Sequence, residues 1–311
     1  MNQETRYKYF SLIIKILIGV GAFGFIVFKL KKGYGENLNY LKSVSIHYTY
    51  VFMALALMIV NWSIETYKWN YLIKRVVKLS FFKAVKIVIT GITISLITPN
   101  RIGEIPGRVY LLNVKDLQKD LMWLTTLGSF TQFICTLLFG ALGIIFTYPY
   151  FNSYLSSSMI IFIFCLLILA VVLVFKLPAA FKNIQLLQKI MSDKLSGLSY
   201  IAVLKVLLMS GLRYGVFFLQ YLLLLWAFNI PLMQVEELML IPVCFLFASA
   251  IPTFLLSEIG VRSSVALFVF GMVSEQTVAI VLASIVLWTF NIAIPGLIGI
   301  FNLKQLKLFN P

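Results

Sequence analysis

The chain has 311 residues, of which 61% are hydrophobic and only 12% are charged. Soluble domains carry roughly half apolar and a quarter charged residues, so this composition excludes an ordinary soluble protein. The formal net charge of +15 is also found in nucleic-acid-binding proteins. The basic residues stand beside apolar runs, however. Enrichment of lysine and arginine in cytoplasmic loops and their attraction to anionic lipids explain this position, so we expect no nucleic-acid partner.

Six apolar runs are long enough to cross a bilayer as single helices, because about 20 helical residues span the hydrocarbon core. They cover 11–29, 49–69, 121–147, 158–176, 199–228 and 278–302. Two further apolar regions, 81–113 and 239–275, are interrupted in the middle by polar and helix-breaking residues.

The distribution of lysine and arginine orients these elements, because short cytoplasmic loops are enriched in both residues. Segments 70–88 and 176–198 are rich in basic residues, as are both termini, whereas 148–157 has no charge and 229–238 has only two glutamates. The loop 30–48 opposes this scheme, because its three lysines fall on the side assigned as outer. The remaining segments predict that both termini are cytoplasmic.

With this orientation, both flanks of 81–113 are cytoplasmic and both flanks of 239–275 are outside. Each region therefore enters and leaves the membrane on one side, as a re-entrant helical hairpin. The order span, span, hairpin, span then occurs twice with opposite orientation, over about 11–147 and about 158–302. Transporters are often built from such inverted repeats, with the substrate site at the repeat interface. We predict a single, all-α polytopic membrane domain with six full spans and two re-entrant helical hairpins in an inverted-topology repeat.

The two interruptions resemble each other in sequence, which supports the repeat. "SLITPNRIGEIPGR" and "SAIPTFLLSEIGVR" share a serine, a proline, a glutamate followed by isoleucine, and an arginine four places after the glutamate. Glu104 and Arg108 of the first stretch thus correspond to Glu258 and Arg262 of the second.

Helix-breaking residues at a hairpin tip leave backbone groups without helical partners. In a membrane such backbone persists only where it is buried in protein or faces water, so a protein-lined cavity is expected at each tip. A half-helix starting near Pro106 would direct its positive dipole end toward this cavity, and Ser257 is the expected N-cap of the second half-helix. The expected tip residues are Pro99, Gly103, Pro106, Gly107, Pro252, Ser257 and Gly260.

Ionisable residues inside a membrane are rare and mark substrate or proton pathways. A guanidinium fork also matches the oxygens of a phosphate. The expected substrate-binding residues are Arg101, Glu104, Arg108, Arg213, Glu258 and Arg262. A second interpretation stays open, in which the two Glu–Arg pairs only pin the hairpins and Arg213 forms a buried ion pair. Glu65 is close to the end of its span and is expected to reach the membrane interface.

Three cysteines lie within apolar runs, where they are expected to be small buried hydrophobic residues and not metal ligands or disulfides. They are Cys135, Cys165 and Cys244. The sequence contains no P-loop, so the energy for transport is expected to come from a gradient or from downhill movement. We expect no cofactor and no metal ion.

The stretch "FFKAVKIVITGITISLITPNRIGEIPGRVYLLN" resembles the transmembrane family of lysylphosphatidylglycerol synthetase/flippase proteins. The signature of that family is a Pro-x-Arg-x-Gly-Glu-x-x-Arg-type stretch after a helix entered by a basic segment. Pro99, Arg101, Gly103, Glu104 and Arg108 match it, with one extra residue before the last arginine.

The later stretch "IPTFLLSEIGVRSSVALFVFG" is similar to the family's second signature, a proline followed by Gly-Gly-x-Gly-x-Arg-Glu. Pro252, Gly260 and Arg262 fit it, whereas Glu258 stands where a glycine is usual and Ser263 replaces the glutamate. The resemblance covers essentially the whole chain. It implies a flippase-like protein acting on a lipid headgroup, and lysyl transfer is not expected because no aminoacyl-transferase domain follows the last span.

Three functions are compatible with these features. The first is a lipid flippase-like transporter that moves the headgroup of an anionic or zwitterionic phospholipid, or of a polyprenyl phosphate, with arginines on the phosphate and glutamates on a cation or a proton. The alternative is a membrane-embedded lipid-modifying enzyme that uses Glu104 and Glu258 as acid and base. The third is a scaffold or regulator that transports nothing.

The expected location is the cytoplasmic membrane of a bacterium, where the protein would be integral and membrane lipids would be its partners. Association of identical copies stays open.

Overall fold

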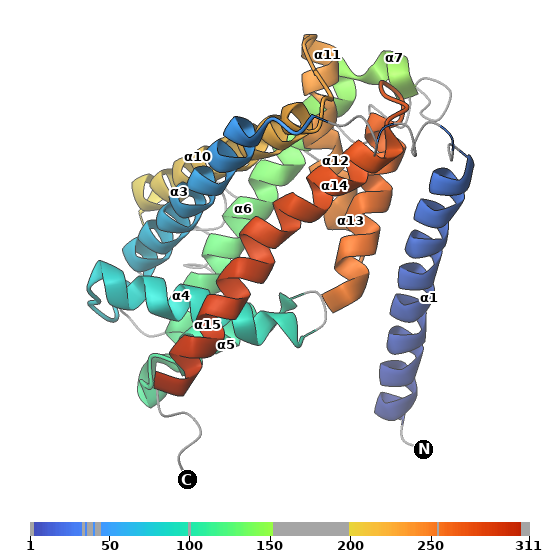
Figure 1. Ribbon diagram of the computed structural model, residues 1–311. Coiled ribbons are helices and arrows are strands. Elements are labelled where there is room, and N and C mark those ends of the chain that lie inside the picture. The colour runs from blue at the N-terminus through green and yellow to red at the C-terminus, as the bar shows by residue number, and fades with distance from the viewer. Residues whose placement is uncertain are drawn as a thin grey trace.

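Every element that the structure describes is a helix, which confirms the predicted all-α class (Figure 1). The computed structural model describes residues 3–32, 35, 40, 45–98, 101–151, 199–253 and 255–305. Its elements are α1 (Gln3–Lys32), α3 (Tyr48–Ile73), α4 (Phe81–Leu96), α5 (Glu104–Tyr110), η2 (Lys115–Leu117), α6 (Gln118–Phe146), α7 (Tyr148–Phe151), α10 (Tyr200–Ala227), α11 (Val235–Leu238), α12 (Leu240–Ala250), α13 (Leu255–Phe270), α14 (Thr277–Trp288), η3 (Thr289–Ala293) and α15 (Ile294–Gln305).

Among the described residues, four helices have the length and the apolar composition to cross a membrane. They are α3, α6, α10 and the continuous helix Thr277–Leu303, which joins α14 to α15 through the π-helical turn η3. These four coincide with four of the six predicted spans. The predicted span 11–29 lies inside α1, a helix of 30 residues, and the predicted span 158–176 lies outside the described residues.

Both interrupted regions consist of two helices with a break between them, as the helix-breaking residues predicted. The second break follows from Pro252, because a residue before proline is driven out of the helical region. Accordingly Ile251 has φ −94° and ψ 121°, and α12 ends there. Pro99 of the first break lies outside the described residues. The expectation that Ser257 is the N-cap of the second half-helix is wrong, because α13 already begins at Leu255 and Ser257 lies within its first turn.

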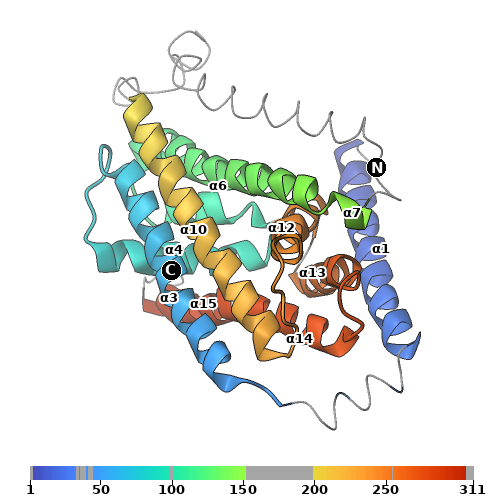
Figure 2. The ribbon, with the colours of Figure 1, turned by 90° about the horizontal axis from the view of Figure 1, so that it is seen from above.

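Helices from the first part of the chain, residues 3–151, pack on helices from the second part, residues 199–305. α4 packs against α15 and α12 packs against α6, while α3 lies along α10, as Figure 2 shows. The first half of each broken helix therefore contacts the last long helix of the other part. α1 packs along α13, at the outer side of the bundle in Figure 2.

Glycines allow the close approach of α4 and α15. A Cβ atom at Gly299 would contact the Thr93 hydroxyl and lie 2.7 Å from the carbonyl oxygen of Ile89. The Thr93 hydroxyl also donates a hydrogen bond to the carbonyl oxygen of Gly296, with an oxygen–oxygen distance of 2.7 Å. Backbone thus lies almost against backbone where the first part of the chain meets the last helix.

We expect Gly299→Ala to lower the free energy of unfolding in detergent by about 1–3 kcal/mol, because the added methyl group overpacks the contact between α15 and α4. Thermal unfolding followed by circular dichroism measures this effect. Gly215→Ala on α10 is the matched control, since no described atom lies within 4 Å of a Cβ atom at that position. Equal midpoints for both variants would contradict the close packing.

Candidate functional site

One face of α3 carries three buried polar side chains in an otherwise apolar helix. Asn61, Glu65 and Lys68 are spaced four and three residues apart, which places them on the same side of the helix. Their exposed fractions are 0%, 5% and 1%. Burial of charged groups in this environment requires partners, and the neighbouring helices provide them.

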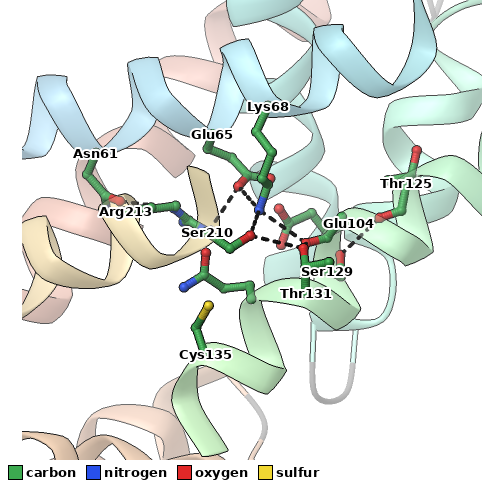
Figure 3. A network of polar contacts seen from close by, with 12 residues as sticks. Asn61, Glu65, Lys68, Glu104, Thr125, Ser129, Thr131, Cys135, Ser210 and Arg213 are labelled. Carbon is green, nitrogen blue, oxygen red and sulfur yellow. Dashed lines mark hydrogen bonds and ion pairs between the residues drawn. The ribbon is translucent and has the colours of Figure 1, made fainter. Parts of the chain in front are cut away.

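The carboxylate of Glu65 is the centre of an ion-pair cluster. Its oxygens lie 2.8 Å from Lys68 Nζ, 2.9 Å from Arg108 Nη1 and 3.1 Å from Arg213 Nη1. Figure 3 shows Glu65 and Lys68 pointing from α3 toward Arg213 of α10. The expectation that Glu65 reaches the membrane interface is therefore wrong, because three cations from α3, α5 and α10 hold it inside the protein.

The ammonium group of Lys68 is bonded on its other sides as well. It donates to the carbonyl oxygen of Gly128 at 3.1 Å and to the hydroxyl of Ser210 at 3.4 Å. Ser210 in turn lies 2.9 Å from the hydroxyl of Thr131 (Figure 3). Together with the ion pair to Glu65, these contacts to α6 and α10 engage the three donors of a buried lysine.

The first predicted Glu–Arg pair forms on α5. Arg108 donates to Glu104 one helical turn earlier and to Glu65 of α3, and only 2% of Arg108 is exposed. The guanidinium can lie there because residue 91 on α4 is glycine, where a Cβ atom would come 2.7 Å from Arg108 Cγ. Gly107 similarly allows close contact with Ile94 of α4, because a Cβ atom at residue 107 would come 3.1 Å from Ile94 Cδ1.

The second predicted pair forms on α13 and reaches the first break. Arg262 Nη2 lies 2.9 Å from Glu258, and Arg101 Nε lies 3.8 Å from the other oxygen of the same carboxylate. Arg101 stands in the connector between α4 and α5 with φ 58°, a left-handed conformation that L residues rarely adopt. An ion pair therefore joins the connector between α4 and α5 to the first turn of α13.

A chain of buried amides continues from the cluster toward the last helix. Asn61 Nδ2 donates to Asn291 Oδ1, and Asn291 Nδ2 donates to Gln220 Oε1, each at 2.8 Å. Asn61 Oδ1 accepts a hydrogen bond from Arg213 Nε at 2.9 Å. Asn291 stands in η3, and π-helical turns of this kind occur frequently at functional sites.

These side chains surround a cavity of about 230 Å³. Its described lining residues are Trp62, Glu65, Lys68, Arg101, Glu104, Ser129, Gln132, Arg213, Phe217, Arg262, Asn291 and Ile292. A second cavity of about 210 Å³ adjoins it and shares Gln132, Arg213, Phe217 and Arg262. Residues from six helical elements thus line one cavity that is rich in polar groups.

Four of the six expected binding residues line this cavity: Arg101, Glu104, Arg213 and Arg262. Arg108 and Glu258 are buried and hold the lining residues by ion pairs.

Of the expected tip residues, Gly103 donates its backbone N–H to the Thr98 hydroxyl at 2.9 Å. Pro106 lies in the first turn of α5, where a missing N–H costs little. Gly260 lies against Phe23 of α1, where a Cβ atom would come 2.9 Å from the ring.

Sequence reasoning missed Lys68 and the amides Asn61 and Asn291. A signal for two of them was present, because the spacing of Asn61, Glu65 and Lys68 marks a polar stripe on one face of α3. Asn291 carries no charge and stands in a strongly apolar helix, so neither its charge nor its neighbours distinguish it.

The family described as lysylphosphatidylglycerol synthase TM region matches residues 12–299, almost the entire chain. The chain belongs to this family. The resemblance found in the sequence is thereby confirmed for the membrane part. No curated protein and no solved structure shows significant similarity to the chain.

Membership in the lysylphosphatidylglycerol synthase TM family and the long apolar helices identify an integral membrane protein with a lipid-related function. The family takes its description from an enzyme, but the match concerns its membrane region alone.

We expect Glu65→Gln to lower the free energy of unfolding by about 3–5 kcal/mol, because three buried cations would lose their shared counter-charge. The unfolding midpoint of purified protein in detergent measures the change. Glu275→Gln is the matched control, since Glu275 is exposed and is not one of the partners in the ion pairs of Glu65. A midpoint of Glu65→Gln equal to that of the control would show that the cluster does not stabilise the fold.

Proposed function

We propose that this protein is a lipid flippase-like transporter whose central cavity accepts the phosphate-bearing headgroup of a membrane lipid. The observation that carries the proposal is the surplus of positive charge around the cavity. Five basic and three acidic side chains form the cluster, so two positive charges have no carboxylate of their own. An anionic group in the cavity would balance them.

The donors of Arg101 support an anion at this place. Arg101 lines the cavity with 26% of its side chain exposed, and its Nε lies 3.8 Å from Glu258, which is too long for a hydrogen bond. A guanidinium in the wall of a cavity can donate to a phosphate diester, whose oxygens have the matching geometry. Anionic and zwitterionic phospholipids and polyprenyl phosphates all carry such a group.

The two breaks are proposed to be the tips of re-entrant hairpins in an inverted repeat, with six spans in total. The exchanged contacts of α4 with α15 and of α12 with α6 support this arrangement, because related halves are expected to make equivalent contacts. The start of α1 and the end of α15 lie at the same end of the molecule in Figure 1, in accord with two cytoplasmic termini. A bacterial cytoplasmic membrane remains the proposed location.

The carboxylates of Glu104 and Glu258 are proposed to position arginines. Glu104 is paired with Arg108, and Glu258 with Arg262 and Arg101. Both carboxylates are thus engaged by guanidinium groups before any substrate is bound. This pairing favours transport over the lipid-modifying enzyme, and it leaves the binding of a cation by these glutamates as a prediction from the sequence alone.

We expect Arg101→Gln to reduce lipid movement in proteoliposomes by about tenfold or more, because the phosphate loses a charge-assisted hydrogen bond. Glu104→Gln should also reduce the rate, since Arg108 would lose its second carboxylate. The measurement is the loss of a fluorescent phospholipid to a quencher that reaches only the outer leaflet.

Lys78→Gln is the control, because Lys78 is exposed and does not line the cavity. Rates in Arg101→Gln and Glu104→Gln equal to that of the control would remove the cavity from the mechanism. Accumulation of a new lipid product during the same assay would instead favour the enzyme.

A further inference from the structure

A line of hydrogen bonds connects the last long helix to Arg213 in the cavity wall. Arg213 Nε donates to Asn61 Oδ1 at 2.9 Å, as Figure 3 shows, and Asn61 Nδ2 donates to Asn291 Oδ1 at 2.8 Å. Asn291 Nδ2 donates to Gln220 Oε1, and Gln220 Nε2 donates to the carbonyl oxygen of Ala54, each at 2.8 Å. At most 2% of each amide residue is exposed. These buried amides therefore find their partners within the protein.

The line spans two levels of the contact between α3 and α10. Asn61 and Ala54 are seven residues apart on α3, which places them on one face about two helical turns apart. Arg213 and Gln220 have the same spacing on α10. Asn61 is bonded to Arg213 at one level, and Ala54 to Gln220 at the other. Asn291 of η3 joins the two levels from the side of the last helix.

The two ends of this line fix the direction of every amide in it. A guanidinium N–H only donates, and a backbone carbonyl only accepts. Reversal of any one amide between these ends would place two NH2 groups or two oxygen atoms face to face. Asn291 is held further, because its NH2 group also donates to the carbonyl oxygen of Leu287 at 3.0 Å. Asn291 therefore determines that Asn61 presents its oxygen, and not its NH2 group, to Arg213.

Arg213 depends on Asn61 because its ion pair alone does not fix its orientation. Nη1 of Arg213 lies 3.1 Å from Glu65, a carboxylate that also pairs with Lys68 and Arg108. One contact at the end of a planar guanidinium leaves the group able to turn, whereas a second contact at Nε restricts its plane. The guanidinium also lies over Trp62, with Cζ 5.2 Å from the ring centroid. Arg213 is thus held in one orientation in the wall of the cavity.

We infer that Asn291 is a positioning residue for Arg213, and that the π-helical turn η3 serves to place Asn291 in this line. This inference rests on the proposed function. Asn291 acts through Asn61, which keeps the guanidinium of Arg213 turned toward both Glu65 and the cavity. The last helix is thereby connected to the positive charge that an anionic headgroup would meet. Lipid movement should then depend on Asn291 only while Arg213 is present.

The test is a double-mutant cycle in proteoliposomes that contain the full chain, with fluorescent phosphatidylglycerol as the probe. We expect Arg213→Gln to reduce lipid movement about tenfold, because a charge-assisted hydrogen bond is lost. Asn291→Leu keeps the branched shape of the side chain and should reduce the rate about three- to tenfold, the usual effect of one hydrogen bond. The double variant should show only the loss of Arg213→Gln, because no arginine is left to orient.

A loss in the double variant equal to the product of the two single losses would overturn the inference. Asn291 would then act independently of Arg213, as a residue that only packs the helices together would. Gln220→Met gives a second cycle with Arg213→Gln, with the same expectation, and decides the question where Asn291→Leu does not fold. Gln220 is not among the described lining residues of either cavity, so its effect has to pass through the line. Wild-type protein that moves no lipid would overturn the proposed function as well.

Ser284→Ala is the matched control on the same continuous helix. Ser284 is also buried, but its hydroxyl lies 2.6 Å from the hydroxyl of Tyr221, which is not a member of the line. This variant should move lipid within about twofold of the wild-type rate. A loss as large as that of Asn291→Leu, which also disappears in the Arg213→Gln background, would show that any buried polar residue of this helix is coupled to Arg213. That result would overturn the specific role of Asn291.

Discussion

The packing of this bundle depends on one carboxylate that forms ion pairs with cations from three helices. Glu65 stands on α3 and pairs with Lys68 of its own helix, Arg108 of α5 and Arg213 of α10. Removing charges from water costs several kcal/mol per ion, so helices that carry these groups are stable only where the charges meet. The requirement fixes α5 and α10 against α3 more tightly than apolar packing would, because an ion pair tolerates little change in distance. The fold and the polar cavity thus share one cause.

Small residues and a strained backbone bring the remaining charges to the same place. Gly91 leaves room for the Arg108 side chain between α4 and α5, and Gly299 lets α15 approach the backbone of α4. Arg101 holds a left-handed conformation, which costs a non-glycine residue about 1–3 kcal/mol. A strained residue persists only where its surroundings favour it, and here its guanidinium reaches Glu258 of the other broken helix. The conformation of Arg101 is therefore favoured by its ion pair.

Much of the fold could be predicted from the sequence, because apolar length and charge act locally along the chain. The long helices, both breaks and the two Glu–Arg pairs four residues apart follow from this local information. The centre of the site could not be predicted in the same way. The interpretation of Glu65 from the sequence rests on its position along its own helix, whereas its partners Arg108 and Arg213 stand 43 and 148 positions later in the chain. The link between Asn61, Asn291 and Gln220 also joins distant segments, and amides in apolar helices give no charge signal. Ser257 shows a smaller error, since a good capping residue two positions inside a helix looks the same in sequence as a cap.

The arrangement of the charges also bears on how a headgroup would be recognised. The described lining of the cavity includes the carboxylates Glu65 and Glu104 together with arginines from the first connector, α10 and α13. Arg213 lies within ion-pair distance of Glu65, and Arg262 within ion-pair distance of Glu258. An anion in the cavity would join these pairs and balance the remaining positive charge. In the proposed mechanism, affinity for lipid therefore comes from the charge surplus that both parts of the chain create.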